Sequence, residues 1–405
     1  MRRKNPFLVF IIKSMFGELI TNLCTGCRAC QNACPVGAIQ MVEDSYRSPV
    51  AHIDSKKCHQ CGLCRKVCPQ LSAFSGSKPE SCYAAWIEAS KKLLQSSSGG
   101  IAHALSSEII NHGGVVFGAF WDDNKVRHGS AKCMEELAKF AGSKYVQSDT
   151  EFTFSEVKDL LIRGKEVLYL GTPCQIEGLL SFLGGRHELL TTCDLVCHGV
   201  PPVGILQDYL EEATGATSFL NVQFRDQGGF ALTVSKMDNT QTRQEMGSNL
   251  YLLGFMQSLF YREVCYSCRC AQEKRIGDLT LGDFWGLDRS TLQKQAPDFV
   301  SLVLVNTAQG RKLFEAILTN IYQEERPLAE AVAGNSQLQA PAWRNTDREL
   351  FFQIYKRKGF LKAVKSTGVY EHCNTPAGKR YRFRQKARRY LLRRLFRMLG
   401  IRKDI

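Results

Sequence analysis

The sequence predicts an α/β protein in which a small cysteine-rich domain is followed by a mixed, largely parallel α/β domain and a basic C-terminal helix. Three observations support this prediction. Eight cysteines form two similar blocks within residues 24–70, strand-like and helix-like apolar patterns alternate from about residue 82, and cations crowd residues 379–405. The 405 residues are 44% hydrophobic and 23% charged, a globular composition that excludes a disordered, collagen-like or coiled-coil chain.

The two cysteine blocks share one spacing. The first is Cys24-x2-Cys27-x2-Cys30-x3-Cys34-Pro, and the second is Cys58-x2-Cys61-x2-Cys64-x3-Cys68-Pro. Bacterial ferredoxins with two [4Fe–4S] clusters use this arrangement, in which the fourth cysteine of each block binds the other cluster. Zinc sites pair Cys-x2-Cys motifs across wider gaps. We therefore predict a two-cluster domain over residues 20–71, with one cluster on Cys24, Cys27, Cys30 and Cys68 and the other on Cys58, Cys61, Cys64 and Cys34. An odd total of 17 cysteines in a long chain argues against a disulfide framework.

The following residues predict the α/β domain. A Ser/Gly/Pro-rich linker over 72–81 leads to a domain over 82–345, and residues 346–405 form an extension. The apolar pattern predicts helices over 101–109, from a Ser155 cap to Gly164, and from Pro173 onward. It predicts strands over 115–120, 166–170, 189–196 and 300–305. Alternating strands and helices favour a largely parallel sheet, with functional sites at the carboxyl ends of its strands.

Four further cysteines lie where such strand ends are expected. Cys174 lies between a predicted strand and helix, where the helix dipole favours a thiolate. Cys197 directly follows another strand, and Cys265-x2-Cys268-x-Cys270 adds a third group of thiols. Loops after adjacent parallel strands can converge, so Cys174, Cys197, Cys265 and Cys268 are candidate ligands of a third cluster. Structural cysteines and zinc remain alternatives.

A small-residue segment, Ser96-Ser-Ser-Gly-Gly100, precedes the first predicted helix of the α/β domain. Free backbone N–H groups and the helix dipole attract phosphate at such a position. The segment lacks the G-x-G-x-x-G pattern of dinucleotide sites, and an ordinary helix cap is the alternative. Two clusters need an electron donor or acceptor, and a flavin links hydride chemistry to single-electron chemistry. This requirement favours a flavin site.

A series of short motifs resembles the coenzyme F-420 hydrogenase/dehydrogenase beta-subunit family over about residues 20–290. In chain order the motifs are Ser98-Gly-Gly-Ile101, Gly113-Gly-Val-Val-Phe-Gly118, Gly142-Ser-Lys-Tyr-Val-Gln-Ser148, Gly171-Thr-Pro-Cys-Gln175, Asp194-Leu-Val-Cys-His-Gly-Val200, Phe224-Arg-Asp226, Cys265-Tyr-Ser-Cys268 and Gly282-Asp-Phe-Trp-Gly286. The resemblance implies an FAD-binding α/β domain that carries the third [4Fe–4S] cluster. It also implies residues near FAD, namely Ser98, Gly99, Gly100, Lys144, Gln147, Thr172 and His198.

The resemblance implies an iron–sulfur flavoprotein oxidoreductase. Electrons would pass between a hydride carrier, such as a deazaflavin of the coenzyme F-420 type or another soluble substrate, and the clusters through FAD. His198 is the candidate proton donor beside the flavin, and packing within its own loop is the alternative. The competing function is an electron-transfer subunit that serves a redox partner protein and has no substrate site of its own.

Charge and hydropathy bear on partners and location. Residues 379–405 carry twelve Lys or Arg and one acid, so they account for +11 of the net charge of +14 and leave +3 elsewhere. A near-neutral body argues against nucleic acid as a partner. Apolar residues recur at helical spacing from Phe383 to Leu399, which predicts a basic amphipathic helix suited to an anionic membrane surface, to RNA or to its own domain. The six-residue apolar run 7–12 is too short to span a membrane and has no following cleavage site, so we expect an unprocessed cytoplasmic protein, peripheral at the inner face of the membrane if the tail binds there.

Overall fold

The computed structural model describes residues 23–88, 96–122, 124–226, 229–373, 376 and 379–380. The predicted basic helix from Phe383 lies outside these residues, and so does the apolar run 7–12. The chain divides into two compact units, Met1–Gly204 with Tyr261–Trp343, and Ile205–Phe260 with Arg344–Ile405. Within the described residues, no helix has the length and hydropathy needed to cross a membrane.

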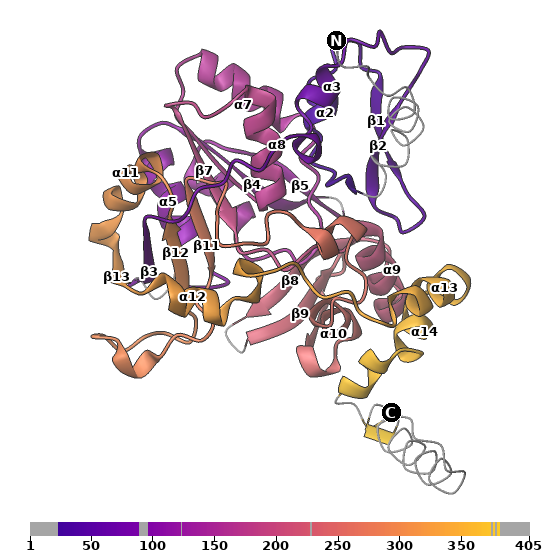
Figure 1. The fold of residues 1–405 in the computed structure, drawn as a ribbon. Helices are drawn as coiled ribbons and strands as arrows, with labels where there is room; N and C mark the ends of the chain where they lie inside the picture. The colour runs from indigo at the N-terminus through magenta and orange to yellow at the C-terminus, as the bar shows by residue number, and fades with distance from the viewer. Residues whose placement is uncertain are drawn as a thin grey trace, which may run out of the picture. The chain divides into compact units, whose positions relative to one another are not determined.

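The cysteine-rich domain opens the first unit and contains an antiparallel ribbon with Ile39 opposite Ile53 (Figure 1). Each cysteine block enters a short helix through a residue in the left-handed backbone region, Arg28 at φ 61° and Gly62 at φ 80°. The repeated spacing therefore produces a repeated local structure. The elements of this domain are α2 (Ala29–Asn32), β1 (Ile39–Glu43), β2 (Pro49–Ile53), α3 (Leu63–Lys66) and the 3-10 turn η1 (Pro69–Leu71).

An eight-stranded mixed sheet forms the body of the first unit, in the order β13-β3-β12-β11-β7-β6-β4-β5. The pairs β4–β6, β6–β7 and β7–β11 are parallel, and the other four are antiparallel. The strands are β3 (Ser81–Ile87), β4 (Val115–Asp122), β5 (Lys125–Ala131), β6 (Val167–Gly171), β7 (Leu190–Leu195), β11 (Leu279–Asp283), β12 (Ser301–Val305) and β13 (Ile321–Glu325).

The expectation of a largely parallel sheet is right only for the four central strands. Two residues join β4 to β5, and so short a connection permits only an antiparallel hairpin. Between β11 and β12 no α-helix lies, so no crossover brings β12 back in the parallel direction. The sheet is therefore mixed, with a parallel centre and antiparallel edges.

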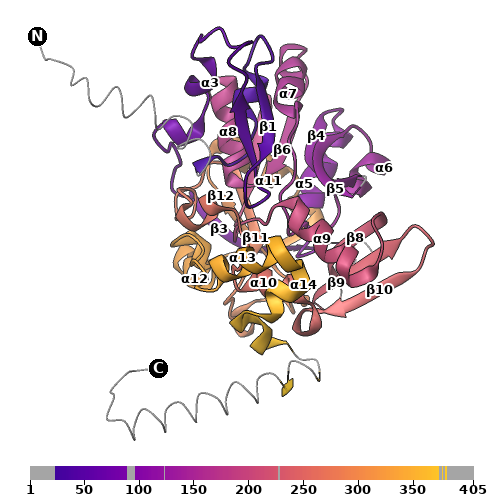
Figure 2. The same ribbon diagram turned by 90° about the vertical axis from the view of Figure 1, so that its right-hand side faces the viewer.

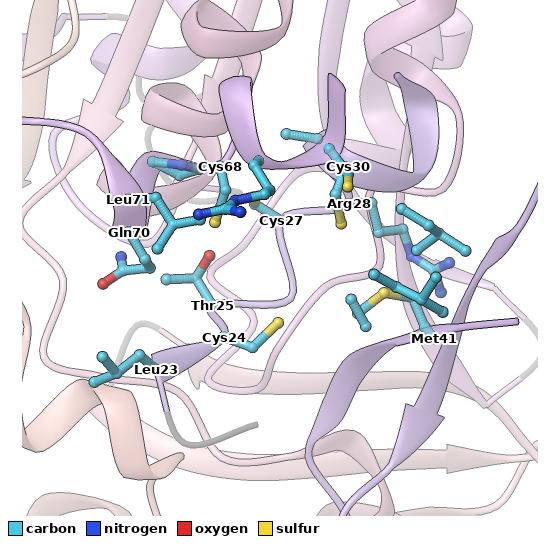
Figure 3. A pocket seen from close by; sticks show the side chains of 17 residues that line it. Leu23, Cys24, Thr25, Cys27, Arg28, Cys30, Met41, Cys68, Gln70 and Leu71 are labelled. Carbon is cyan, nitrogen blue, oxygen red and sulfur yellow. The ribbon is translucent and has the colours of Figure 1, made fainter. Parts of the chain in front are cut away.

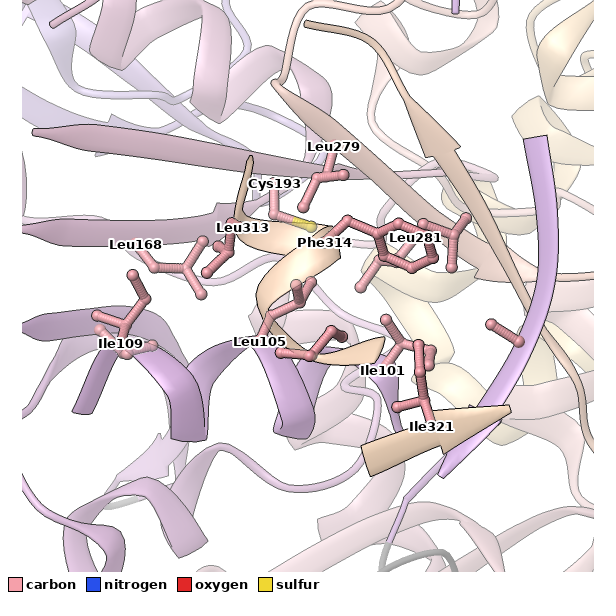
Figure 4. Packing of buried hydrophobic residues seen from close by; sticks show 14 of the residues in the cluster. Ile101, Leu105, Ile109, Leu168, Cys193, Leu279, Leu281, Leu313, Phe314 and Ile321 are labelled. Carbon is pink, nitrogen blue, oxygen red and sulfur yellow. The ribbon is translucent and has the colours of Figure 1, made fainter. Parts of the chain in front are cut away.

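Helices cover both faces of this sheet. On one face, Ile101, Leu105 and Ile109 of α5 recur at helical spacing and pack beside Leu168 and Phe314 (Figure 4). On the other face, α7 and α8 share a core with Cys27, Ala29 and Val67 of the cysteine-rich domain. Helix α2 accordingly contacts α8 and α7, and it lies beside α8 in Figure 1. Figure 2 shows α3 and β1 of the same domain on the side of α7 and α8. The helices are α5 (Ile101–Asn111), α6 (Met134–Leu137), α7 (Thr153–Ile162), α8 (Pro173–Leu183), α11 (Ala308–Ala316) and α12 (Leu328–Gly334), and the 3-10 turns are η2 (Ala138–Phe140), η4 (Glu263–Ser267), η5 (Arg289–Thr291), η6 (Leu318–Asn320) and η7 (Ser336–Leu338).

Most predicted elements are present. Strands β4, β6, β7 and β12 and helices α5 and α8 lie where the apolar pattern predicts them. The predicted Ser155 cap is wrong, because α7 already begins at Thr153. The Ser155 N–H and hydroxyl instead donate to Asn32 Oδ1, at 3.1 and 3.0 Å. A residue of the cysteine-rich domain therefore takes the contact that a capping residue of the helix would make.

The second unit combines a three-stranded antiparallel sheet, in the order β10-β9-β8, with helices. Its core is aromatic, with Tyr251 and Phe260 at a centroid distance of 5.3 Å and Phe260 and Phe360 at 5.5 Å. The Glu212 carboxylate accepts N–H groups at the start of α14. The elements are α9 (Val203–Thr214), β8 (Phe219–Asp226), β9 (Gly229–Lys236), β10 (Gln241–Glu245), η3 (Met246–Ser248), α10 (Leu250–Met256), α13 (Arg348–Lys358), α14 (Phe360–Lys365) and η8 (Gly368–His372).

Candidate functional site

A cavity of about 270 Å³ lies inside the cysteine-rich domain (Figure 3). Five cysteines line it: Cys24, Cys27, Cys30 and Cys68, which the spacing assigns to one cluster, and Cys64, which the spacing assigns to the other. Ile39, Met41, Ala51 and Ile53 of the β-ribbon and Leu71 complete an apolar lining. The first four of these thiols match the ligand set of an iron–sulfur cubane. We call these four cysteines the cluster I site.

The second set, Cys34, Cys58, Cys61 and Cys64, is called the cluster II site. Cys64 lies within electrostatic reach of the other three thiols. Backbone N–H groups support the thiolates of both sites at equivalent positions. Gly26 N–H donates to Cys24 Sγ and Gln60 N–H donates to Cys58 Sγ, each at 3.4 Å. Such hydrogen bonds stabilise thiolates and tune cluster potentials.

Burial opposes thiolate formation at the cluster I site when only protein surrounds the sulfur. It raises the pKa of Cys27 to about 12 and also raises the pKa of Cys30, because a buried thiolate loses its hydration. A cationic iron centre removes this cost by direct ligation. Among the described residues, no three His, Cys, Asp or Glu side chains gather as the ligands of a single metal ion would. The thiolates of a cubane bind different iron corners and therefore lie further apart.

The third group of cysteines assembles at the carboxyl edge of the parallel strands. Cys174 lies in the first turn of α8 directly after β6, and Cys197 follows β7, which pairs with β6 in parallel. Cys265 lies in η4, and Cys268 ends it. The Cys174 thiol lies within electrostatic reach of the other three. We call Cys174, Cys197, Cys265 and Cys268 the cluster III site.

Two neighbours modify this site. The Thr172 hydroxyl lies 3.2 Å from Cys174 Sγ. A hydrogen bond from the Cys270 thiol lowers the pKa of Cys268 to about 7, and the Cys270 thiol also lies 3.6 Å from Glu177 Oε2. Cys270 is therefore a fifth thiol at the edge of the cluster III site, one that the spacing alone did not assign.

A buried ion pair holds the loop that follows Cys268. Arg275 and Asp194 are 1% and 0% exposed, and Arg275 Nη2 lies 2.8 Å from Asp194 Oδ1. The other carboxylate oxygen accepts the N–H groups of Ile276 and Gly277 at 3.2 and 2.9 Å. Because Asp194 belongs to β7, this pair fixes the loop against the strand that leads to Cys197. Removing one partner of such a pair typically costs about 3–5 kcal/mol.

Helix α8 brings the cluster I and cluster III sites together. A Cβ atom placed on Gly178 would lie 2.8 Å from Cys27 Sγ, so the helix backbone contacts a cluster I ligand directly. Cys174 precedes Gly178 by one turn on the same helix face, about 6 Å along the helix axis. The two sites therefore share one short stretch of helix.

Two arginines also connect the cluster III loop to the cysteine-rich domain. Arg262, which is 2% exposed, donates to Cys24 O at 2.8 Å and to Thr25 O at 2.7 Å. Arg269 donates to Pro69 O at 2.6 Å and forms an ion pair with Glu177 at 2.6 Å. Neither arginine is predictable from the sequence, because the carbonyl groups that they bind lie about 200 residues or more away in the chain. Their positions beside Cys265 and Cys268 were the only available signal.

The predicted flavin residues lie in loops around the same sheet edge. Ser98, Gly99 and Gly100 precede α5, and this segment contacts the loop with Lys144 through a 2.6 Å bond from Ser143 N–H to Ser97 Oγ. Ser98 Oγ and Gln147 Oε1 are both buried, and neither has a hydrogen-bond partner among the described residues. Unpaired buried polar atoms are rare, and a bound polar ligand would satisfy them. Ser98 and Gln147 thus offer two polar atoms to a ligand bound at the predicted flavin site.

Two of the predicted flavin residues, Lys144 and Gly99, are held by close contacts with the protein backbone. The Lys144 ammonium donates to Phe140 O and Ala141 O at 2.9 Å, and burial lowers its pKa to about 7. An anionic ligand nearby would offset that desolvation cost. A Cβ on Gly99 would lie 2.4 Å from Ala85 O of β3. Gly99 is thus required for packing on the sheet, so a substitution there cannot report on a ligand.

The remaining candidates flank the cluster III site. Thr172 caps α8 through a capping box with Gln175, and Gln175 donates to Ser148 Oγ at 3.0 Å. Gln147 donates to Thr25 O at 3.3 Å and so reaches the cluster I site. His198 follows Cys197, and burial lowers its pKa. The structure therefore places Thr172 and His198 at the cluster III site and Gln147 beside the cluster I site.

Two parts of the chain match known protein families. Residues 164–331 match the C terminus of the coenzyme F420 hydrogenase/dehydrogenase beta subunit, and residues 23–71 match the 4Fe-4S dicluster domain. The dicluster match supports two [4Fe–4S] clusters in the cysteine-rich domain.

Three individual proteins are also similar to this chain. An uncharacterized protein of Methanocaldococcus jannaschii is 26% identical over 200 residues, which cover 42% of this chain and 55% of that protein. An uncharacterized polyferredoxin-like protein of the same organism is 35% identical over 69 residues, which cover 15% of this chain and 41% of the relative. The chain thus spans about half of the length of these relatives. A chain of the F420-reducing [NiFe] hydrogenase complex from Methanosarcina barkeri aligns over 72% of this chain and 91% of its own length, with a TM-score of 0.45 and 17% identity.

Proposed function

We propose that this chain, which joins an N-terminal 4Fe-4S dicluster domain to the C-terminal domain typical of F420 hydrogenase/dehydrogenase beta subunits, is an iron–sulfur flavoprotein oxidoreductase. It would connect a soluble hydride carrier, of the deazaflavin F420 class or another class, to the cluster I and cluster II sites. When bound, FAD would supply the conversion between a two-electron hydride and single electrons. The residues that would hold FAD are those of the Ser98–Gly100 segment together with Lys144, Gln147, Thr172 and His198.

The observation that carries this proposal is the position of α8. Its first turn presents Cys174 to the cluster III site, and Gly178, one turn later, contacts Cys27 of the cluster I site. Arg262 and Arg269 hold the two parts in this register. A helix that touches ligands of both sites gives electrons a short route between the flavin loops and the dicluster domain.

The first prediction concerns metal and flavin content. Protein purified without oxygen should contain about twelve iron atoms per chain if all three sites hold cubanes, together with one FAD. About eight iron atoms would restrict the clusters to the dicluster domain. Iron, acid-labile sulfide and flavin are measured on the same sample. Stoichiometric zinc with little iron or sulfide would contradict the proposal.

A hydride-donor screen separates this proposal from its alternative, an electron-transfer subunit with no substrate site. The isolated chain is mixed with reduced deazaflavin or reduced nicotinamide cofactors, and flavin bleaching is followed before cluster bleaching. Flavin reduction by one donor would support an oxidoreductase with its own substrate site. If dithionite reduces the flavin but no hydride donor does, the alternative is favoured.

The second prediction concerns pH and Lys144. The free protein holds this ammonium at a pKa of about 7, and a flavin phosphate beside it would raise that pKa. FAD binding would then take up a proton above pH 7, so FAD affinity should fall as pH rises from about 7 to 9, by up to tenfold per unit. Lys144→Met should bind FAD more weakly and with a flat pH profile, whereas Lys144→Arg should remain charged and restore affinity.

The control for this experiment is Lys139→Met, because Lys139 is an exposed lysine five residues away. Equilibrium dialysis of apoprotein against FAD gives the affinity at each pH. Equal pH slopes for the unmodified chain and Lys144→Met would place the flavin phosphates elsewhere.

A further inference from the structure

The cluster II site lies at an exposed surface of the cysteine-rich domain. Cys61 is exposed, and so are its neighbours from His59 to Leu63. Two apolar side chains on this segment, Leu63 and Leu71, are 41% and 43% exposed. The cluster I site differs, because Cys27 is buried against α8 and Arg262 binds the carbonyl groups beside Cys24. Of these two sites, cluster II is the one that a separate protein can approach.

The same surface is strongly cationic. Residues 55–71 contain four cations, Lys56, Lys57, Arg65 and Lys66, and no Asp or Glu. All four cations are exposed. Residues 1–378 carry a net charge of only +3, so these seventeen residues are an exception in a near-neutral body. The nearest acid in the chain is Asp54, which accepts the Lys56 N–H at 2.9 Å.

Two cations of this domain outside residues 55–71 form ion pairs. Arg28 forms an ion pair with Asp149 of the body, and Arg47 forms one with Glu43 on its own ribbon. The net positive charge of residues 55–71 lies on the segment that carries Cys58, Cys61 and Cys64. The charge and the cluster ligands therefore lie on the same piece of surface.

We propose that this surface, residues 55–71, is the docking site of a small, soluble, acidic electron-carrier protein. Exposed Leu63 supplies an apolar contact next to Cys64 of the cluster II site, and exposed Leu71, beside the cluster I cavity, extends it. The surrounding cations select and steer an acidic partner. One electron crosses per encounter, so the cluster II centre is oxidised as the carrier is reduced, or the reverse. No bond forms or breaks, and no further reactant is needed. The inference rests on the dicluster domain and not on the proposed flavin site.

The test measures electron transfer from the chain to an acidic carrier. The full-length holoprotein is reduced with stoichiometric dithionite and mixed with an oxidised acidic ferredoxin or flavodoxin in a stopped-flow instrument. The rate constant should fall steeply as salt is raised. The double reversal Lys57→Glu with Lys66→Glu should lower the low-salt rate about tenfold or more. Iron content and reaction with a small neutral quinone should not change.

The matched control is Lys165→Glu with Lys312→Glu, which makes the same change in net charge at exposed lysines outside this domain. It should leave the rate near that of the unmodified chain. Basic cytochrome c serves as the inverse probe, and the Lys57/Lys66 reversal should accelerate its reduction. The proposal would be overturned if both double variants slowed the reaction equally. It would also be overturned if the rate constant with the acidic carrier did not change with salt or with either reversal. The proposal would also be overturned if the Lys57/Lys66 reversal abolished binding to anionic vesicles but left electron transfer to the acidic carrier unchanged. That outcome would reassign the surface to a membrane.

Discussion

Replacing Cys174 or Cys268 with alanine should remove about four of twelve iron atoms and abolish electron transfer from the flavin to the dicluster domain. Both thiols belong to the cluster III site, where the Cys174 thiol lies within electrostatic reach of Cys268. The dicluster domain should keep about eight iron atoms, because its eight cysteines lie within residues 24–68. Iron analysis and stopped-flow spectroscopy with a hydride donor or photoreduced flavin measure both effects.

Cys193→Ala is the matched control for these variants. Its sulfur is also buried beside the sheet, but it packs among Leu168, Leu279 and other apolar side chains of the core (Figure 4). That variant should lose some stability and retain all iron. Cys270→Ser is a second control, because the Cys270 thiol lies 3.6 Å from Glu177 Oε2 and forms a hydrogen bond with Cys268. Full iron in Cys174→Ala and Cys268→Ala would return these residues to a structural role. Iron loss in Cys270→Ser alone would make Cys270 the ligand in place of Cys268.

Local signals in the sequence predicted much of what builds these sites. The repeated cysteine spacing predicted the dicluster domain, which the 4Fe-4S dicluster match supports. The start of α8 was predicted because Pro173 suits the first helical position. Such features depend on residues only a few positions apart. Their physical cause is therefore visible in a short window of sequence.

The contacts between the parts were not predictable in this way. Arg262 binds the carbonyl group of Cys24 across a sequence separation of 238 positions, and no local pattern signals that pairing. Arg269 and Gly178 likewise act through neighbours that only the tertiary fold supplies. The antiparallel edges of the sheet were missed for the same reason, since strand direction depends on how each connection returns. These features depend on contacts between residues that are far apart in the chain, so no local sequence pattern predicts them.

Gly178 provides the sharpest test of the path along α8. In a helix interior, glycine to alanine normally stabilises the helix by about 1 kcal/mol. At this position a Cβ would lie 2.8 Å from Cys27 Sγ and 2.9 Å from Cys27 Cβ, closer than real Cβ contacts allow. A cysteine that is fixed to iron cannot move aside as a flexible side chain would. The steric conflict should therefore outweigh the gain in helix propensity, so that the change from glycine to alanine destabilises the protein.

We accordingly expect Gly178→Ala to destabilise the holoprotein and to slow electron transfer into the dicluster domain, and Gly178→Val to do so more strongly. The cluster III site should keep its iron, because Cys174 lies one turn away and its loop neighbours are unchanged. Ser181→Ala on the same helix serves as the control and should change neither property. Thermal unfolding, iron content and stopped-flow rates distinguish the cases. A Gly178→Ala protein that is about 1 kcal/mol more stable, with unchanged iron and rate, would show that α8 does not press on Cys27 and that electrons take another route.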